Sequence, residues 1–253
     1  MKKLILIMLL VISFTLLGCN SSFNSSNNNL PPINDLPMPD VEEDSSLDDN
    51  HKKKVYAVSK VSGLRIRTKP NSTSSIIGTL DKSDAVVLLG KENGFFKTTY
   101  KEQTAYLYAE HCSTLEIERE STQIEQAIDL GSTLLGYPYV WGSQRYHWGN
   151  GKLNYNFVNG EFDCSALVLY VYYKSNGVIL DLTSRTQSLN GIEVERSKLK
   201  RGDLMFFTNA SRKNKVGIER IGHVGIYFGN NYILHTASDH AVIEPISSTR
   251  WSY

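Results

Sequence analysis

The chain is 253 residues long, with 41% apolar and 21% charged residues and a formal net charge of +1. This length allows one large domain or two small ones, and the composition excludes a collagen-like, polytopic membrane or wholly disordered protein. The charge is uneven: residues 20–50 carry seven acids and no base, whereas residues 51–253 carry 25 basic and 19 acidic residues. This moderately basic body suits an anionic polymer or surface, but without a basic stripe interleaved with aromatics it does not indicate nucleic acid.

Residues 1–18 form a predicted signal peptide. Lys2 and Lys3 precede an apolar run, Leu4–Leu17, that is shorter than the about 20 residues of a membrane-spanning helix. The run ends in Leu-Leu-Gly-Cys19, which resembles the bacterial lipobox, a motif whose cysteine is acylated and becomes the first residue of the mature chain. We therefore expect an exported lipoprotein, anchored to the membrane through Cys19 and facing the cell wall. The alternative is a plain signal peptide with an accidental cysteine.

Residues 19–54 are predicted to be a lipid-anchored, disordered tether. Between Asn20 and Asn50, 24 of 31 residues are Asn, Ser, Asp, Glu or Pro. Such a segment buries too little apolar surface to offset the entropy of ordering it. As a flexible coil it spans about 30 Å root-mean-square, which would hold the body away from the membrane.

Residues 55–117 are predicted to be a small all-β barrel. Short β-type runs are separated by turn signals such as Lys69-Pro70-Asn71-Ser72, and they cover residues 64–67, 76–80, 85–89, 95–100 and 105–107. The sequence from Leu64 to Leu89 resembles the bacterial SH3-like domain. This resemblance implies a module that accompanies a cell-wall enzyme and either binds wall or shapes its partner's cleft. The alternative is a spacer without a ligand.

Residues 118–253 are predicted to form an α+β domain. Thr122 and Glu125 indicate the capping box of a first helix, which Gly136 and Pro138 end. A second helix is expected from Asp163 to Asn176-Gly177. The strands expected after it cover residues 204–207, 223–228, 232–237 and 242–246. Helices followed by antiparallel strands predict helices packed on an antiparallel sheet.

One cysteine and two histidines of this domain form a candidate catalytic set. Asp163 is a good N-cap and places Cys164 in the first helical turn, where the helix dipole stabilises a nucleophilic thiolate. If residues 229–231 form a three-residue loop, His235 pairs with Gly225 and faces the same side as His223; a two-residue loop would separate the histidines. One imidazole could then take the thiol proton while the other orients it. We also expect the glycines flanking His223 to leave room for the helix end.

Five motifs, in their chain order, resemble those of the NlpC family of papain-like cell-wall cysteine peptidases. They are Pro138-Tyr-Val-Trp-Gly142, Phe162-Asp-Cys-Ser165, Arg201-Gly-Asp-Leu-Met-Phe-Phe207, Gly222-His-Val-Gly-Ile-Tyr227 and Ile233-Leu-His235. The resemblance covers residues from about 122 to 253. It implies that Cys164 is the catalytic nucleophile, His223 the general base and His235 the orienting residue.

The resemblance also implies a substrate and the residues that bind it. Tyr139 would lie beside the cysteine, and Asp163 and Ser165 would contact substrate. The family commonly cleaves the bond between γ-D-glutamate and the diamino acid in peptidoglycan stem peptides. A peptidoglycan or muropeptide partner is therefore expected, and the diamino acid is either diaminopimelate or lysine. A peptide amine held near Asp163 would favour freed stem peptides over intact wall.

The chain departs from the family at four places. Ser143 and Ala166 stand where glycines are usual, and residues 144–161 and 208–221 look like insertions. Each insertion precedes a catalytic residue, so both are expected to border the cleft, unless they are tolerated surface loops.

Neither a cofactor nor a metal site is expected, because no cluster of Cys and His has ligand spacing. Cys112 is expected to be a packed thiol; a Cys112–Cys164 disulfide is the alternative. Two other functions compete with a peptidase: a non-catalytic wall-binding lipoprotein, and a thiol-dependent amidase or acyltransferase on the same fold. The sequence does not indicate an oligomeric state.

Overall fold

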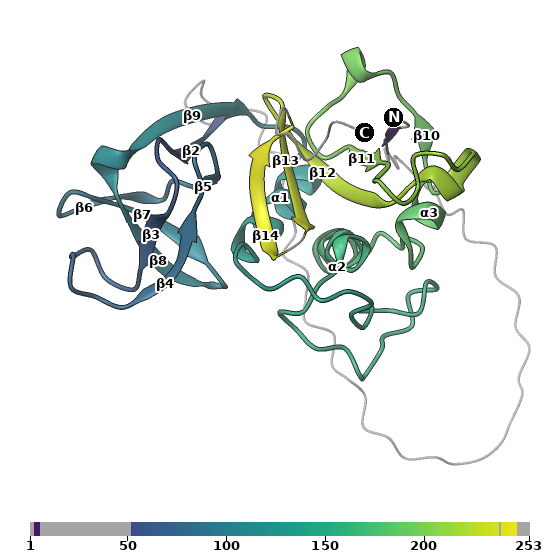
Figure 1. The fold of residues 1–253 in the computed structure, drawn as a ribbon, viewed down its shortest axis with the longest axis horizontal. Coiled ribbons are helices and arrows are strands. Elements are labelled where there is room, and N and C mark those ends of the chain that lie inside the picture. Colours follow the sequence, from purple (N-terminus) through teal and green to yellow (C-terminus); the bar gives the residue numbers. More distant parts are fainter. Residues whose placement is uncertain (1–2, 6–51, 238, 247–253) are drawn as a thin grey trace, which may run out of the picture.

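An N-terminal unit built from strands packs beside a C-terminal unit that contains both helices and strands (Figure 1). The computed structural model describes residues 3–5, 52–237 and 239–246. The strands of the N-terminal unit are β2 (Lys53–Ser59), β3 (Leu64–Arg67), β4 (Ile76–Leu80), β5 (Ala85–Val87), β6 (Gly90–Glu92), β7 (Phe95–Tyr100), β8 (Gln103–Tyr108) and β9 (Cys112–Glu118), with a short 3-10 helix, η2 (Ala109–His111), before β9.

These strands form two antiparallel sheets, in the orders β5-β2-β9 and β4-β3-β8-β7-β6. Alternation explains the inward faces: Leu64 and Ile66 of β3 are buried, whereas Arg65 between them is exposed. The five predicted strands are present. β2, β6 and β9 were not predicted, because each carries lysines or glutamates that weaken the β pattern.

In the C-terminal unit, helices pack against an antiparallel sheet whose strands differ in length. Its helices are α1 (Thr122–Thr133), α2 (Cys164–Asn176), α3 (Ser184–Gln187), η3 (Arg196–Lys198) and η4 (Gly217–Arg220). The sheet order is β10-β1-β11-β12-β13-β14, built from β1 (Lys3–Ile5), β10 (Ile192–Glu193), β11 (Leu204–Phe207), β12 (His223–Gly229), β13 (Tyr232–Ala237) and β14 (His240–Pro245). Helix α2 packs on β12 and β13, as the α+β prediction requires.

Most of the predicted signal peptide, Cys19 and the tether lie outside the described residues, apart from β1 and residues 52–54. Within the described residues, no helix has both the length and the apolar character needed to cross a membrane.

Helix α2 is the central element of this unit and begins and ends as predicted. The Asp163 side chain accepts a hydrogen bond from the Ala166 N–H at 2.9 Å, which caps the helix. Gly177 ends it in a left-handed conformation, with φ 67°. Residues 164–172 are all buried, so the helix start is held firmly within the core.

The start of α1 differs from the prediction. Its N-cap is Ser121, without a side-chain hydrogen bond, and Thr122 is already the first helical residue. Glu125 is 2% exposed and bonds to Nε of Arg201 at 2.7 Å and to the Glu120 N–H. A buried carboxylate needs an ionic partner, so Glu125 serves Arg201 instead of a capping box.

The two units share one hydrophobic cluster and are also joined by polar contacts. The N–H groups of Lys101 and Glu102, in the β7–β8 turn, donate to the carbonyls of Leu135 and Thr133. Carbonyls at a helix end lack partners within the helix, so this turn supplies them for the end of α1. The Glu102 carboxylate also accepts from the Tyr137 hydroxyl, at 2.7 Å, and so supports the chain leading toward Tyr139.

Candidate active site

Cys164 is the first residue of α2 and is 8% exposed. Its sulfur accepts hydrogen bonds from the N–H groups of Ser165 and of Val224, the residue after His223. Burial raises the pKa of the Cys164 thiol to about 11, with a further increase from the Asp163 charge, and the two N–H groups only partly oppose this. Burial thus opposes the stabilisation of a thiolate that the start of a helix provides.

The β12–β13 hairpin brings the two histidines to one face by an unexpected route. Its turn contains two residues, Asn230 and Asn231, with φ angles of 47° and 64°. A two-residue turn would separate the histidines, but a β-bulge between Tyr227 and Gly229 restores the predicted register, with Ile226 opposite Leu234. The loop length was wrong and the register was right.

A hydrogen-bonded chain links both histidines to a carboxylate. Nε2 of His223 lies 3.0 Å from Nδ1 of His235, and Nε2 of His235 lies 3.1 Å from Oε1 of Glu244. His235 is fully buried, and Glu244 is 9% exposed. Because a carboxylate only accepts, Glu244 favours the His235 tautomer with its proton on Nε2. Nδ1 of His235 then accepts from Nε2 of His223, which leaves Nδ1 of His223 as the basic nitrogen.

The glycines near His223 leave room for side chains of neighbouring segments. A Cβ at Gly222 would collide with the Asn209 side chain. A Cβ at Gly225 would lie 2.6 Å from Cδ1 of Ile233 and 2.8 Å from Cβ of His235. Gly225 thus lets β12 and β13 pack closely at His235. That the glycines also leave room for the cysteine-bearing helix stays a prediction.

Asp163 and Ser165 are buried and already paired, mainly with an arginine from the first insertion. Nη2 of Arg145 lies 2.9 Å from Oδ2 of Asp163 and 3.1 Å from Oγ of Ser165. Ser143 adds a further contact, since its hydroxyl accepts from the Asp163 N–H at 2.9 Å. The serine found where the family usually has glycine thus supports the helix cap. Asp163 could hold a substrate amine only if Arg145 gave way.

Tyr139 lies close to the cysteine, as the resemblance implied. Burial raises the pKa of the Tyr139 hydroxyl to about 12, with further increases from the charges of Cys164 and Asp163. The hydroxyl therefore stays protonated near neutral pH and can donate a hydrogen bond. The exposed Trp141 follows it, at 85% exposure.

The two remaining predictions concern Cys112 and the second insertion. Cys112 and Cys164 are both free, buried thiols, so the alternative of a disulfide between them is wrong. Cys112 donates to the Tyr108 carbonyl at 3.6 Å. In the second insertion, Arg212 pairs with Glu219, which also binds Arg185 of α3.

Sequence reasoning missed Arg145 as a partner of Asp163 and missed Glu244 altogether. Glu244 had a signal: it is the one acid in the otherwise apolar run Ala241-Val-Ile-Glu-Pro245. In the sheet, His235 pairs with Val242 and Ile233 with Glu244, so Glu244 is the diagonal neighbour of His235 on one face.

The fold and this site define a papain-like domain in which a buried cysteine begins a helix, close to one histidine of a hydrogen-bonded pair. Residues 136–253 match the model of the NlpC/P60 family, and residues 62–113 match that of the bacterial SH3 domain. Residues 136–253 therefore belong to the NlpC/P60 family, and the family and fold predicted from the motifs are confirmed.

The chain covers half or less of the length of the named relatives that it matches. The chain is 34% identical, over 53% of its length, to the peptidoglycan DL-endopeptidase CwlO of Bacillus licheniformis, and covers 27% of that protein. It is 29% identical, over 66% of its length, to the γ-D-glutamyl-L-lysine dipeptidyl-peptidase of Bacillus subtilis, and covers 49% of it. A solved structure of an NlpC/P60 family protein from Bacillus cereus is 22% identical, with a TM-score of 0.40, over 78% of this chain and 60% of that one.

Proposed function

We propose that this chain is a cysteine endopeptidase that hydrolyses peptidoglycan stem peptides. The observation that carries the proposal is the hydrogen-bonded chain from Glu244 through His235 to His223, together with the contact of Cys164 with the residue after His223. This arrangement supplies a nucleophile, a base with a fixed tautomer and the groups that orient it.

In the first step, Nδ1 of His223 takes the thiol proton while the sulfur of Cys164 attacks the carbonyl carbon of the scissile amide. The resulting imidazolium gives that proton to the leaving nitrogen, the C–N bond breaks, and a thioester remains on Cys164. Water then adds to the thioester carbon with His223 as base. The thiol regains a proton as the C–S bond breaks, which releases the peptide acid. Because the thiol pKa is high, proton transfer accompanies the attack instead of preceding it.

The bond between γ-D-glutamate and the diamino acid is the proposed point of cleavage. Two observations support it: the names of the relatives, which include a DL-endopeptidase and a γ-D-glutamyl-L-lysine dipeptidyl-peptidase, and the basic body, which suits a substrate with carboxylates. Lysine and diaminopimelate give products of different mass. Digestion of both muropeptides therefore identifies the accepted residue directly.

The pairing of Asp163 with Arg145 bears on which substrates enter. The expected preference for a free peptide amine required an available Asp163 carboxylate, whereas this carboxylate is buried and bound to Arg145. We therefore propose that a free amine is not required and that N-acylated stem peptides are accepted. Rates on a free and an N-acetylated stem peptide should be similar, and an Arg145→Gln variant should regain preference for the free amine.

Export and anchoring through Cys19 remain part of the proposal. Cleavage before Cys19 would remove β1, so the mature sheet would contain β11 to β14 without the strand now beside β11. Mass spectrometry of the N-terminal peptide from membrane fractions tests this directly. An uncleaved Met1 terminus, or a Cys19 without lipid, would contradict it.

The deciding experiment for the activity is a digest of defined muropeptides, with product masses as the readout. A peptidase releases a fragment ending in γ-D-glutamate and a new amine on the diamino acid. Release of intact stem peptide from muramic acid would indicate an amidase, and unchanged substrate with retained binding would indicate a non-catalytic protein.

A further inference from the structure

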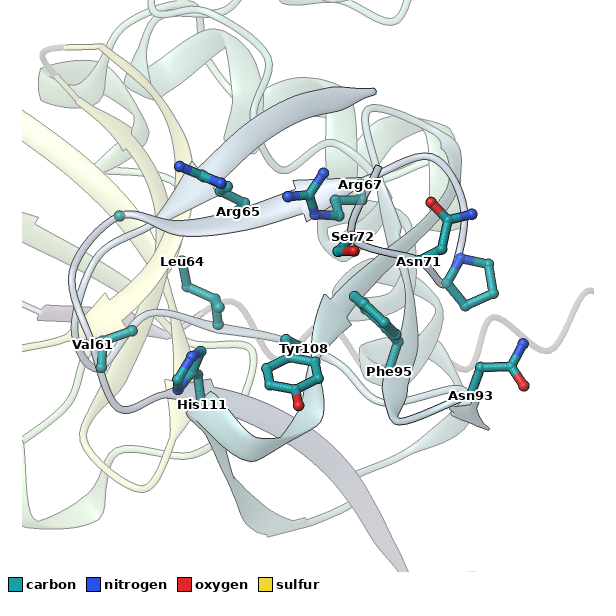
Figure 2. Close-up of a pocket in the computed structure, with 12 residues that line it drawn as sticks. Val61, Leu64, Arg65, Arg67, Asn71, Ser72, Asn93, Phe95, Tyr108 and His111 are labelled. Carbon is teal, nitrogen blue, oxygen red and sulfur yellow. The ribbon is translucent and has the colours of Figure 1, made fainter. Parts of the chain in front are cut away.

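A cavity lies entirely within the N-terminal unit, between β3 with the loop after it and the η2 turn (Figure 2). Its volume is about 730 Å³, within the range of about 300–1,000 Å³ typical of ligand pockets. All of its lining residues lie between Val61 and His111, so the cavity is separate from the candidate active site.

The lining is cationic and contains no carboxylate. Arg65 and Arg67 come from β3, and Arg67 is only 9% exposed. Nη1 of Arg67 donates to the Ser74 carbonyl at 2.7 Å, but among the described residues neither arginine forms an ion pair. A guanidinium buried without a counter-charge is unfavourable, so an anion in the cavity would supply the missing partner.

The floor and rim fit a peptide. Leu64 and Phe95 are buried and apolar, and the Phe95 and Tyr108 rings pack edge to face at 5.3 Å. Figure 2 shows the side chains of Asn71 and Asn93 at one end of the cavity. Amides of this kind can pair with a peptide backbone, and the aromatic floor can contact an aliphatic side chain.

Glu110 of η2 is an acid that interacts with Tyr108 at this rim. It accepts a hydrogen bond from the Tyr108 hydroxyl, which raises the pKa of that tyrosine, and it does not line the cavity. Tyr108 is 41% exposed, so its ring is accessible to a ligand.

We propose that this cavity binds the free carboxylate end of a peptide. Arg67, assisted by Arg65, pairs with the carboxylate, because a guanidinium matches its two oxygens. Phe95 and Tyr108 contact the side chain next to it. The site goes beyond the proposed hydrolysis, since it would hold an unamidated peptide end, of the kind that wall peptides carry, at a distance from Cys164.

The test uses the full chain with Cys164→Ala, labelled with ¹⁵N, and the tripeptide acetyl-Ala-Lys-D-Ala, which contains no γ-glutamyl bond. We expect saturable shifts of the Arg67 Nε–H and of the backbone amides of Tyr108 and His111. The C-terminal amide of the same tripeptide should bind about tenfold more weakly or worse, because it lacks the charged acceptor. Equal binding of acid and amide, or shifts confined to residues around position 164, would overturn the proposal.

Substitutions in the cavity test which residues bind the tripeptide. Arg67→Gln should weaken binding about tenfold or more, and Arg67→Lys should weaken it less, because the charge remains. If loss of the Ser74 bond unfolds the Arg67→Gln protein, Tyr108→Ala, at an exposed position, serves in its place and should also weaken binding. Arg196→Gln is the matched control, because Arg196 is an exposed arginine of η3 outside the cavity. This variant should bind the tripeptide as tightly as the parent protein does.

A titration with inorganic phosphate tests whether the cavity binds a different anion. If it gives the same saturating shifts at the same concentrations as the tripeptide, the cavity belongs to phosphate-bearing polymers and the peptide assignment is wrong. Failure of the proposed hydrolysis would be seen in a different protein, with native Cys164, as unchanged stem peptide. Binding in this cavity and cleavage at Cys164 can therefore fail independently.

Discussion

Two buried polar networks in this molecule have opposite characters. At the contact between the two units, Arg201 is 5% exposed and bonds to Glu125, to the Phe228 carbonyl and to the Tyr56 hydroxyl. In the other, Glu244 and His235 are also buried, but the hydrogen-bonded chain continues to His223, which is partly exposed. The first network is closed by protein groups, and the second reaches the surface through an imidazole.

The difference shows how burial can serve either stability or chemistry. Burial alone would raise the pKa of Glu125, but its hydrogen bonds and ion pair with Arg201 outweigh this and hold the pKa lower. Its charge is therefore fixed, and the network can only hold the units together. The histidine network ends in a partly exposed imidazole, whose two ring nitrogens can donate and accept a proton. The experiments below test this contrast.

The largest expected effect is on Cys164. Cys164→Ala should abolish hydrolysis of a stem peptide without loss of fold, because a small apolar residue suits the buried start of α2. Product masses and the melting temperature are the measurements. Cys112→Ser is the matched control, since Cys112 is also a buried thiol, and it should leave activity nearly unchanged. Activity in the alanine variant would remove Cys164 from the mechanism.

The histidines should differ in degree. His223→Ala removes the base and should lower kcat about 10²–10⁴-fold. His235→Ala should cost less, and His235→Asn less still, because an amide can accept the hydrogen bond from His223. Steady-state kinetics of the three variants decide this. Equal losses would mean that the two histidines do not have separate roles.

The closed network should matter for stability alone. Arg201→Met leaves Glu125 buried without its partner, which should cost about 3–5 kcal/mol in the free energy of unfolding. Lys54→Met, at the more exposed Lys54–Asp129 pair on the same contact between units, should cost about 0–1 kcal/mol. Denaturant unfolding measures both. If Arg201→Met lowers kcat of the folded protein as much as His223→Ala does, the contrast between the networks is wrong.

The raised pKa of Cys164 gives a pH dependence. Since the thiol keeps its proton up to a pKa of about 11, the thiolate fraction should rise about tenfold per pH unit, or about 100-fold between pH 7 and pH 9. Iodoacetamide alkylation, followed by mass spectrometry in the Cys112→Ser protein, measures it. A rate that is already maximal at pH 7 would instead indicate a preformed thiolate paired with His223.

How far the sequence predicts this site depends on the range of the interaction. The Asp163 cap, the start of α2 and the strands of the histidine hairpin follow from local patterns, and the structure confirms them. The Asn230-Asn231 turn with its bulge was not predicted, because a bulge depends on how two strands pair and not on either strand alone. Arg145 and Glu244 were missed for a similar reason: Asp163 is 18 residues from Arg145 and His235 is 9 residues from Glu244, but only the fold sets which side chains meet.

The smallest expected effect concerns Glu244, which does not touch the reacting atoms. Its carboxylate can only accept, and so keeps the His235 proton on Nε2 and the basic nitrogen of His223 on Nδ1. In Glu244→Gln, the amide NH₂ can face His235 instead, which moves the proton to Nδ1 of His235 and reverses the His223 tautomer. Where a carboxylate is bonded directly to a catalytic histidine, its replacement by an amide lowers kcat about 10⁴-fold. Glu244 is one imidazole further away, so we expect about a tenfold lower kcat, an unchanged KM and a displaced pH profile. Imidazole ¹⁵N shifts of His235 report the tautomer, and Glu195→Gln, at an exposed glutamate that pairs with Lys198, is the control. If kcat falls while the His235 tautomer is unchanged, Glu244 acts through packing and not through the proton chain.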